Sequence, residues 1–338
     1  MNRRTITILI LVAAGALLAG CEQDTPEAAD RSKADPIRLT SDGSDPKVQL
    51  RPTLGAGTWP MRFSLSRQTE MVVDANSPIV SRFLVEGDYT VEVQEQADAP
   101  TRAVLRFQRV RITLTDFFRS GREDTKVYDT DKPTEVPELY PAWSKLGEIL
   151  LSASYTYVLD EQGRILDIEG LDAVLDDLPV EIGMDMQSAL TAMSADSKTG
   201  ELVARQLILG GWASNMPDAP VGSGAEWTLT SRHRLPGVPA SDLEMRYKAD
   251  LQEDLRLDES MSYELGEKIQ RGPDAPVLET AEYEQAGLRF HRISDGWPVR
   301  LESKLTGRNR IRDSELGKVF TESIEQTCRV EIVQDSAE

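Results

Sequence analysis

The sequence predicts a mainly β protein in which long antiparallel strands form curved sheets with a helical insert. Three observations lead to this expectation. Apolar and polar residues alternate over long stretches, as in strands that bury one face. Turn-forming residues that include glycine separate pairs of these stretches. Apolar residues take helical spacing in one region, between residues 171 and 195.

The folded part opens with a long alternating segment. Six of its apolar residues are odd-numbered, with mostly polar residues between them: Trp59, Met61, Phe63, Leu65, Met71 and Val73. The next strand carries Tyr89, Val91 and Val93. A third strand begins with Ala103, Leu105 and Phe107 and continues with Val110, Ile112 and Leu114 on the opposite parity. This change of parity predicts a β-bulge or a corner near Gln108 and Arg109.

Two hairpins are expected further along. Residues 155–159 run through Asp160-Glu161-Gln162-Gly163 into residues 165–168, which predicts a strand, a turn and a strand. Ser294-Asp295-Gly296 marks the second hairpin turn. The later strands are expected at 227–235, 243–257, 261–265, 288–293, 297–305 and 320–333.

Residues 171–215 differ from the rest. Leu171, Val174, Leu175 and Leu178 have helical spacing before Pro179, and Ile182, Met186, Leu190 and Met193 follow it. Two helical segments broken at the proline are therefore expected. Residues 201–209 fit either a short helix or a strand.

A weak internal echo divides the β-rich part into two candidate units, 47–170 and 220–335, joined by residues 171–215. Gly57-Thr58-Trp59 opens one unit and Gly224-Ala225-Glu226-Trp227 opens the other. A duplicated β-unit and a chance similarity among strands both explain this echo.

The N-terminus has the layout of a secretory signal. Arg3 and Arg4 precede an apolar run from Ile6 to Leu18, which is short for a membrane span of roughly 20 residues. The segment Leu18-Ala19-Gly20-Cys21 resembles the lipobox of bacterial lipoproteins. That resemblance implies removal of residues 1–20, with cleavage between Gly20 and Cys21, and acylation of Cys21. An ordinary signal peptide is the alternative.

The expected organisation follows from this assignment. Residues 21–46 contain many acids and few large apolar groups, which predicts a flexible acidic tether before a β-rich domain at 47–335. The expected membrane contact is the lipid anchor at Cys21. Glu22 follows the cysteine, where lipoproteins of the inner membrane often carry Asp. We therefore expect the outer membrane of a bacterial envelope, with the domain facing the periplasm.

Charge and cysteine content narrow the function further. Without residues 1–20 the chain has 36 basic and 57 acidic side chains, a formal net charge of −21. Such a surface repels nucleic acid, so we expect no nucleic-acid partner. If Cys21 is acylated, Cys328 is the remaining thiol, and its place among Ile324, Val330 and Ile332 on one strand face predicts a packed core cysteine.

No pattern in the chain supports a catalytic, cofactor or metal site. His233 and His291 lie on separate strands without a third ligand, so surface or cross-strand histidines are expected. Asp129-Thr130-Asp131 and Asp42-Gly43-Ser44-Asp45 lack the spacing of a calcium loop and are interpreted as turns. Ser223 precedes a strand, unlike the serine of a nucleophile elbow, and is expected in a loop.

Large side chains on the strand faces leave two alternatives open. They are Trp59, Phe63, Met71, Phe107 and Trp297. By default these residues form a filled core, and the alternative is the lining of a pocket for a lipid or other apolar ligand.

The body of the chain resembles a family of uncharacterised bacterial lipoproteins that carry a domain of unknown function. The resemblance rests on Cys21, Val127-Tyr128-Asp129-Thr130, the hairpin from Leu159 to Gly170, and Pro220-Val221-Gly222 before Trp227. That family often has Gly-Asp before the tryptophan, whereas this chain has Gly224-Ala225-Glu226. A looser, architectural resemblance is to the lipoprotein-localisation type of lipid carrier, which implies a curved antiparallel sheet with helices on its concave side.

Together these observations predict a membrane-anchored envelope lipoprotein, without enzymatic activity or cofactor, that binds an apolar ligand or a partner protein. One alternative is a structural or assembly lipoprotein with no small ligand. Another is a hydrolase whose carboxylates leave no local sequence signature.

Overall fold

The computed structural model consists of one large antiparallel β-sheet. The structure describes residues 37–50, 56–73, 78–94, 100–117, 122–132, 148, 151–152, 154–159, 165–170, 216–217, 219–233, 235, 238, 241–252, 254–270, 276–294, 298–313 and 317–333. All fourteen strands named in these ranges belong to this sheet. The mainly β, antiparallel prediction is confirmed.

The strands of the first half are β1 (Ile37–Ser41), β2 (Gly57–Val73), β3 (Ile79–Gln94), β4 (Thr101–Phe117), β5 (Glu123–Asp129), β6 (Ser154–Leu159) and β7 (Ile165–Glu169). Those of the second half are β8 (Glu226–His233), β9 (Ser241–Leu251), β10 (Leu255–Glu264), β11 (Ile269–Gln270), β12 (Val277–His291), β13 (Pro298–Arg312) and β14 (Val319–Ile332).

The strand order merges the two predicted units into a single sheet. From one edge to the other the order is β1-β8-β9-β10-β12-β13-β14-β2-β3-β4-β6-β7. The two halves pair where β1 lies beside β8 and, over a longer stretch, where β14 pairs with β2, from Phe320 opposite Val73 to Ile332 opposite Met61. Strand β4 pairs with β6 through residues 101–106 and with β5 through residues 111–117. The two units therefore share one hydrogen-bonded ladder.

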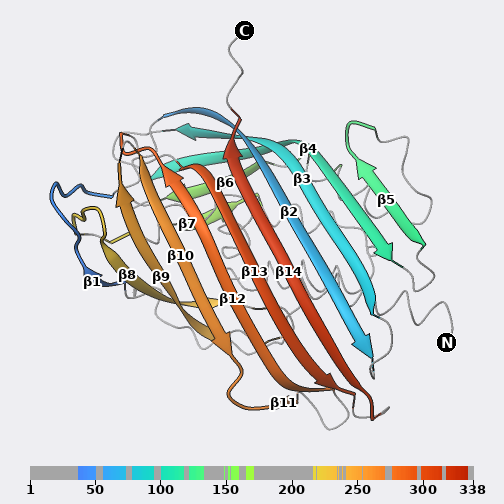
Figure 1. Ribbon diagram of the computed structural model, residues 1–338. Helices are drawn as coiled ribbons and strands as arrows, with labels where there is room; N and C mark the ends of the chain where they lie inside the picture. The colour runs from blue at the N-terminus through green and yellow to red at the C-terminus, as the bar shows by residue number, and fades with distance from the viewer. Residues whose placement is uncertain are drawn as a thin grey trace.

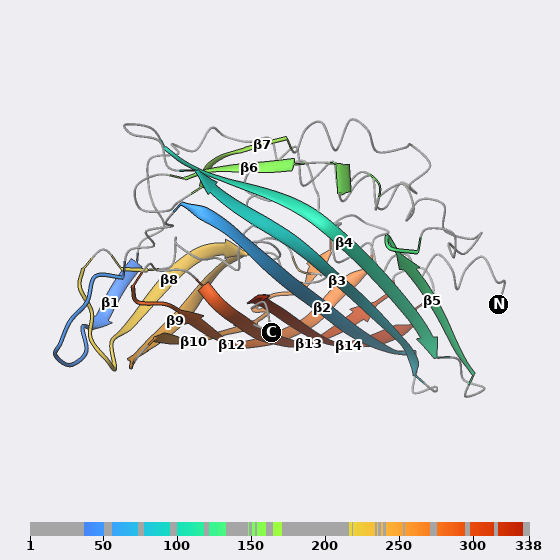
Figure 2. The ribbon, with the colours of Figure 1, turned by 90° about the horizontal axis from the view of Figure 1, so that it is seen from above.

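The sheet is long and strongly curved. Figure 1 shows strands β2, β3 and β12 to β14 running side by side across the molecule. Seen from above, the sheet bends through β2, β3 and β4, so that β6 and β7 lie behind the part formed by β12 to β14 (Figures 1 and 2). This curvature gives the sheet a concave face and a convex face.

Side chains alternate between a buried and an exposed face along each long strand. In β9, Leu243, Met245, Tyr247 and Ala249 are buried, and the residues between them are exposed. The buried face carries the core cluster of β8 to β14, centred on Trp227, Leu257 and Tyr283. Burial of this apolar face is the main contribution to stability that the structure offers.

The predicted irregularities and hairpins are largely confirmed. The register between β3 and β4 shifts between Asp88 and Tyr89, which face Arg109 and Phe107, so Gln108 is the extra residue of a bulge. Strands β6 and β7 form the expected antiparallel pair. Strands β12 and β13 also pair, joined through the segment that contains Ser294.

Several strand boundaries need correction. The strand expected at 261–265 is the second part of β10, and the strand expected at 297–305 extends to Arg312. Ile37–Ser41 forms strand β1 against β8, although the sequence had placed it in the tether; a short edge strand can be polar because it needs only one partner. The strand expected at 243–257 is two strands, β9 and β10, separated near Gln252. Strand β12 starts at Val277 rather than 288. The helical segments expected at 171–215 lie outside the described residues.

Candidate functional site

Polar side chains occupy a band within the otherwise apolar buried face. The buried polar residues are Arg67, Thr69, Thr115, Glu259, Arg289, His291, Asn309 and Glu322. All except Thr115 lie on the neighbouring strands β10, β12, β13, β14 and β2. Buried polar groups normally have hydrogen-bond or charge partners, because an unpaired one opposes folding.

Glu259 and Arg289 form a buried ion pair between β10 and β12. The Arg289 Nε atom donates to Glu259 Oε2 at 2.7 Å, and its terminal nitrogen lies 2.6 Å from the same oxygen. Gln285 donates to the other carboxylate oxygen at 3.3 Å. The Glu259 side chain is 1% exposed, so the pair is held away from water.

Glycines on the buried face make room for large side chains of the next strand. A Cβ on Gly287 would lie 2.4 Å from Glu259 Oε1, and a Cβ on Gly307 would lie 2.1 Å from the Tyr283 ring. Each glycine is the direct cross-strand partner of the side chain that covers it. A methyl group at either position would force the facing side chain to move, so the glycines provide the space that these side chains occupy.

Tyr283, Asn309 and Glu322 form a hydrogen-bonded chain across β12, β13 and β14. The Tyr283 hydroxyl donates to Asn309 Oδ1 at 3.0 Å, and Asn309 Nδ2 donates to Glu322 Oε2 at 3.0 Å. Burial raises the pKa of Tyr283, so its hydroxyl stays protonated and remains a donor. The chain thus satisfies both groups of the Asn309 amide.

Arg67 lies on β2 next to this chain but outside its hydrogen bonds. The residue is 2% exposed, and its Nε and both terminal nitrogens are buried without a hydrogen-bond partner. Burial lowers the pKa of Arg67, and the negative charge of Glu322 acts against that shift. No ion pair of Arg67 occurs among the described residues. A buried guanidinium with no acceptor is the least satisfied group of this face.

Aromatic rings line the buried face on both sides of the polar band. Phe63, Tyr89 and Phe107 contact one another across β2, β3 and β4, with centroid distances of 5.9–6.1 Å. On the other side, Trp227 stacks on Tyr247 at 5.7 Å. The face therefore combines aromatic ends with a polar middle.

The large side chains that the sequence suggested as core or pocket lining differ in their burial and contacts. Phe63 is buried, and Phe107 packs beside it. Met71 is half-buried and faces Glu322 of β14. Trp59 lies on the same parity, and the Arg292 guanidinium stands 4.8 Å from its ring centre. Trp297 lies outside the described residues.

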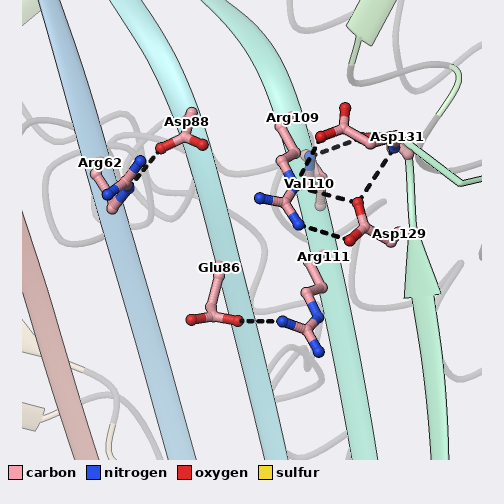
Figure 3. Close-up of polar contacts among 9 residues, drawn as sticks. Arg62, Glu86, Asp88, Arg109, Val110, Arg111, Asp129 and Asp131 are labelled. Carbon is pink, nitrogen blue, oxygen red and sulfur yellow. Dashed lines mark hydrogen bonds and ion pairs between the residues drawn. The ribbon is translucent and has the colours of Figure 1, made fainter.

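The exposed face beside the bulge carries a ladder of ion pairs (Figure 3). Arg62 pairs with Asp88 at 2.7 Å, and Arg111 with Glu86 at 3.7 Å. Arg109 contacts Asp129 at 2.6 Å and Asp131 at 3.1 Å. Because exposed pairs contribute little each, this ladder serves mainly to fix the register of β2 to β5.

The acidic turn at 129–131 is occupied by protein groups. The Arg109 guanidinium donates twice to the Asp129 carboxylate, which lowers the pKa of Asp129. The Thr130 hydroxyl accepts from the Val110 amide at 2.9 Å. Among the described residues there is no cluster of three side chains suited to a metal ion.

The segment at 42–45 packs against residues 222–224. Asp42 pairs with Lys47, and its carbonyl accepts from the Gly222 amide at 2.8 Å. Ser223 lies in a turn, as expected, and its hydroxyl donates to Asp250 at 2.9 Å. The Ser223 hydroxyl therefore holds a carboxylate in place.

The two histidines lie on strands. His291 is 3% exposed on the buried face of β12, so the expectation of a surface side chain was wrong for it, although it does lie across from Leu255 of β10. His233 pairs with Ser241 in the β8–β9 ladder.

Cys328 lies on the buried face of β14, between Ser303 of β13 and Leu65 of β2. Burial raises the pKa of this thiol to about 11, so it is protonated at neutral pH.

Gly20 and Cys21 lie outside the described residues. In the part of the chain that is described, no helix has the length and apolarity needed to cross a bilayer.

No family model and no curated protein match this sequence. A structure titled "Lipid-protein interactions in lipovitellin" has a TM-score of 0.43 and 14% identity, and covers 84% of this chain and 26% of that one. This chain thus spans about a quarter of that protein. The β domain of the Bordetella autotransporter BrkA scores 0.22 at 6% identity, with 81% of this chain and 100% of that chain covered. Pseudomonas aeruginosa OccK7 (OpdD) scores 0.21 at 10% identity, with coverages of 83% and 100%. All three similarities are weak.

Proposed function

We propose that this protein is a lipid-anchored envelope protein that binds an acyl-chain ligand on the buried face of its curved sheet. The ligand's hydrocarbon would lie along the aromatic and aliphatic side chains of that face. The protein would act by binding rather than by chemistry on the ligand.

The composition of the buried face carries this proposal. Ligand sites are lined mainly by apolar and aromatic side chains, with a few polar groups at set positions. Phe63, Tyr89 and Phe107 supply the aromatic part, and Arg67 and Asn309 are among the polar groups. A face built only for packing has no use for an unpaired guanidinium, because each such group opposes folding.

The hydrolase hypothesis finds less support in the geometry. It requires two converging buried acids, and the candidates are Glu259 on β10 and Glu322 on β14. Three strand spacings separate these strands, which is about 14 Å. Glu259 is neutralised by Arg289, and Glu322 is bound by Asn309, so the two acids belong to different networks.

The anchoring part of the proposal rests on the lipobox-like segment that ends at Cys21. Acyl chains on this cysteine would hold the domain at the outer membrane, facing the periplasm, as in the lipoprotein family that the sequence resembles. Two or more chains provide stable attachment.

Fractionation of cells tests the anchor. The full chain with Cys21→Ala is expected in the soluble fraction, whereas the control Cys328→Ala is expected to stay with the membranes. Intact-mass measurement of the membrane form should give the mass of residues 21–338 plus acyl groups. A Cys21→Ala chain that remains membrane-bound would overturn this part of the proposal.

Native mass spectrometry tests the ligand. The full chain, purified from a bacterial envelope in a mild detergent, is expected to carry bound acyl lipid as discrete mass increments beyond the anchor. The increments should persist after exchange into a second detergent. A chain that is ligand-free, and stays so after incubation with palmitate, would contradict the binding proposal.

A further inference from the structure

We propose that Arg67 is the head-group site of this ligand and binds a carboxylate or phosphate at the end of an acyl chain. This inference rests on the function proposed above and adds a chemical class to it. The ligand class is an acidic amphiphile, such as a fatty acid or an anionic phospholipid.

The guanidinium of Arg67 is buried and has no hydrogen-bond partner. Arg67 is 2% exposed, and none of its three side-chain nitrogens has a partner. Its neighbours across the ladder are Gln326 on β14 and Phe83 on β3. By contrast, Arg289, the other buried arginine of the face, is bound to Glu259 at 2.6 Å.

This arrangement destabilises the folded protein. A charge taken out of water without a partner opposes folding strongly, and proteins keep such groups mainly where they have a task. An oxyanion placed against the guanidinium would supply the missing acceptors. Guanidinium groups match carboxylate and phosphate oxygens in a two-bond geometry, which gives such contacts both strength and direction.

The surroundings of Arg67 change from apolar to polar along strand β2. Towards one end lie Leu65 and Phe63 on the same face, continuing into the cluster of Phe63, Tyr89 and Phe107. Towards the other end lies Thr69, beside the Glu322–Asn309 network. An acyl chain would fit the apolar side while its head group meets Arg67.

Glu322 is the acid that faces this site from β14, and it does not replace the ligand. Its Oε2 atom accepts from Asn309 at 3.0 Å, and it makes no ion pair with Arg67 among the described residues. Its charge partly offsets that of Arg67, which favours a head group with one negative charge over one with two.

Binding measurements on the full chain in detergent test the assignment. Native mass spectrometry would compare palmitate, methyl palmitate and phosphatidylglycerol, with free phosphate and acetate as head groups without a chain. Arg67→Met is expected to weaken palmitate and phosphatidylglycerol binding about tenfold or more. It should leave the weaker binding of methyl palmitate unchanged. Arg67→Lys should recover part of the loss.

A control variant and the possible results distinguish the head-group assignment of Arg67 from the proposed binding of an acyl chain. Arg62→Met changes an arginine on the exposed face of the same strand and should bind palmitate as the unmodified chain does. If acyl lipids bind but Arg67→Met binds palmitate equally well, the head-group assignment is wrong and the proposed function stands. If no acyl ligand binds, both fail. If free phosphate binds as tightly as phosphatidylglycerol, the site serves an anion without a chain, which also overturns the assignment.

Thermal unfolding provides a second readout. Because Arg67→Met removes an unpaired buried charge, its Tm without ligand should equal or exceed that of the unmodified chain, while palmitate should raise that Tm less. Should the single variant fail to fold, Arg67→Met combined with Glu322→Gln removes both charges. If neither folds, Arg67 has a structural role and the proposal is overturned.

Discussion

The ring of Tyr283 lies flat over Gly307, its cross-strand partner, so closely that a Cβ on the glycine would stand 2.1 Å from the ring. This contact directs the Tyr283 hydroxyl to Asn309, which in turn binds Glu322. A single absent methyl group therefore positions three polar side chains beside Arg67.

Gly307→Ala is expected to destabilise the protein by about 1–3 kcal/mol, because the added methyl displaces the ring and strains its hydrogen bond. Urea unfolding measures the difference. Gly266→Ala is the control: nothing lies within 4 Å of its added Cβ, so its effect should be near zero. Equal stabilities for the two variants would contradict the packing described here.

Removing Glu259 from its buried ion pair with Arg289 should destabilise the protein more than Gly307→Ala does. Glu259→Gln leaves the Arg289 charge uncompensated and is expected to lower the free energy of unfolding by about 3–5 kcal/mol. Glu302→Gln, which breaks the surface pairs with Arg300 and Arg329, should cost less than about 1 kcal/mol. The double variant Glu259→Leu/Arg289→Met should recover most of the loss, and an additive double variant would argue against direct coupling.

The Arg109–Asp129 pair predicts a pH-dependent effect. The pKa of Asp129 is lowered in the folded protein, so its contribution is full above the usual aspartate pKa of 3.8 and is lost as the pH falls through the lowered folded pKa. Asp129→Asn should therefore cost about 0.5 kcal/mol at neutral pH, with screening taken into account, and progressively less below that window. Glu86→Gln, at the longer 3.7 Å pair, should change stability less. A cost that is constant with pH would refute the assignment.

The thiol of Cys328 should react slowly in the folded protein. With its pKa raised to about 11 by burial, little thiolate is present at pH 8, and the thiolate is the reactive form. Labelling with iodoacetamide, followed by intact mass, is expected to be slow in buffer and fast in urea. Similar rates in both would show that the side chain is accessible and its pKa ordinary.

Many strands of the sheet could be predicted from the sequence because apolar and polar residues alternate over long stretches. The parity change around Gln108 located the bulge, and the odd-numbered run from Trp59 to Met71 defined the buried face of β2. The turn near Gln252 was missed because the apolar residues on either side share the same parity. The first half of β12 was missed because Tyr283 is the one large side chain among Ala281, Gln285 and Gly287 on its buried face, which leaves too short an apolar alternation.

The buried polar side chains around Arg67 could not be predicted as a group from the sequence. Arg67 and Thr69 hold apolar positions in the odd-numbered series of β2, and this interruption is the signal that the sequence contains. Its meaning depends on Glu322 and Asn309, which come from strands far along the chain. Such a juxtaposition follows from the β14–β2 pairing, and no local pattern encodes that pairing.

Fluorescence quenching by a dibrominated stearate tests most directly whether the buried face holds an acyl chain. The full chain, kept in an amphipathic polymer, contains tryptophans on this face, including Trp59 and the buried Trp227. We predict saturable quenching by the brominated acid but not by stearate, and less quenching in the Trp59→Phe variant. Identical fluorescence with the brominated and unbrominated acids would contradict the account.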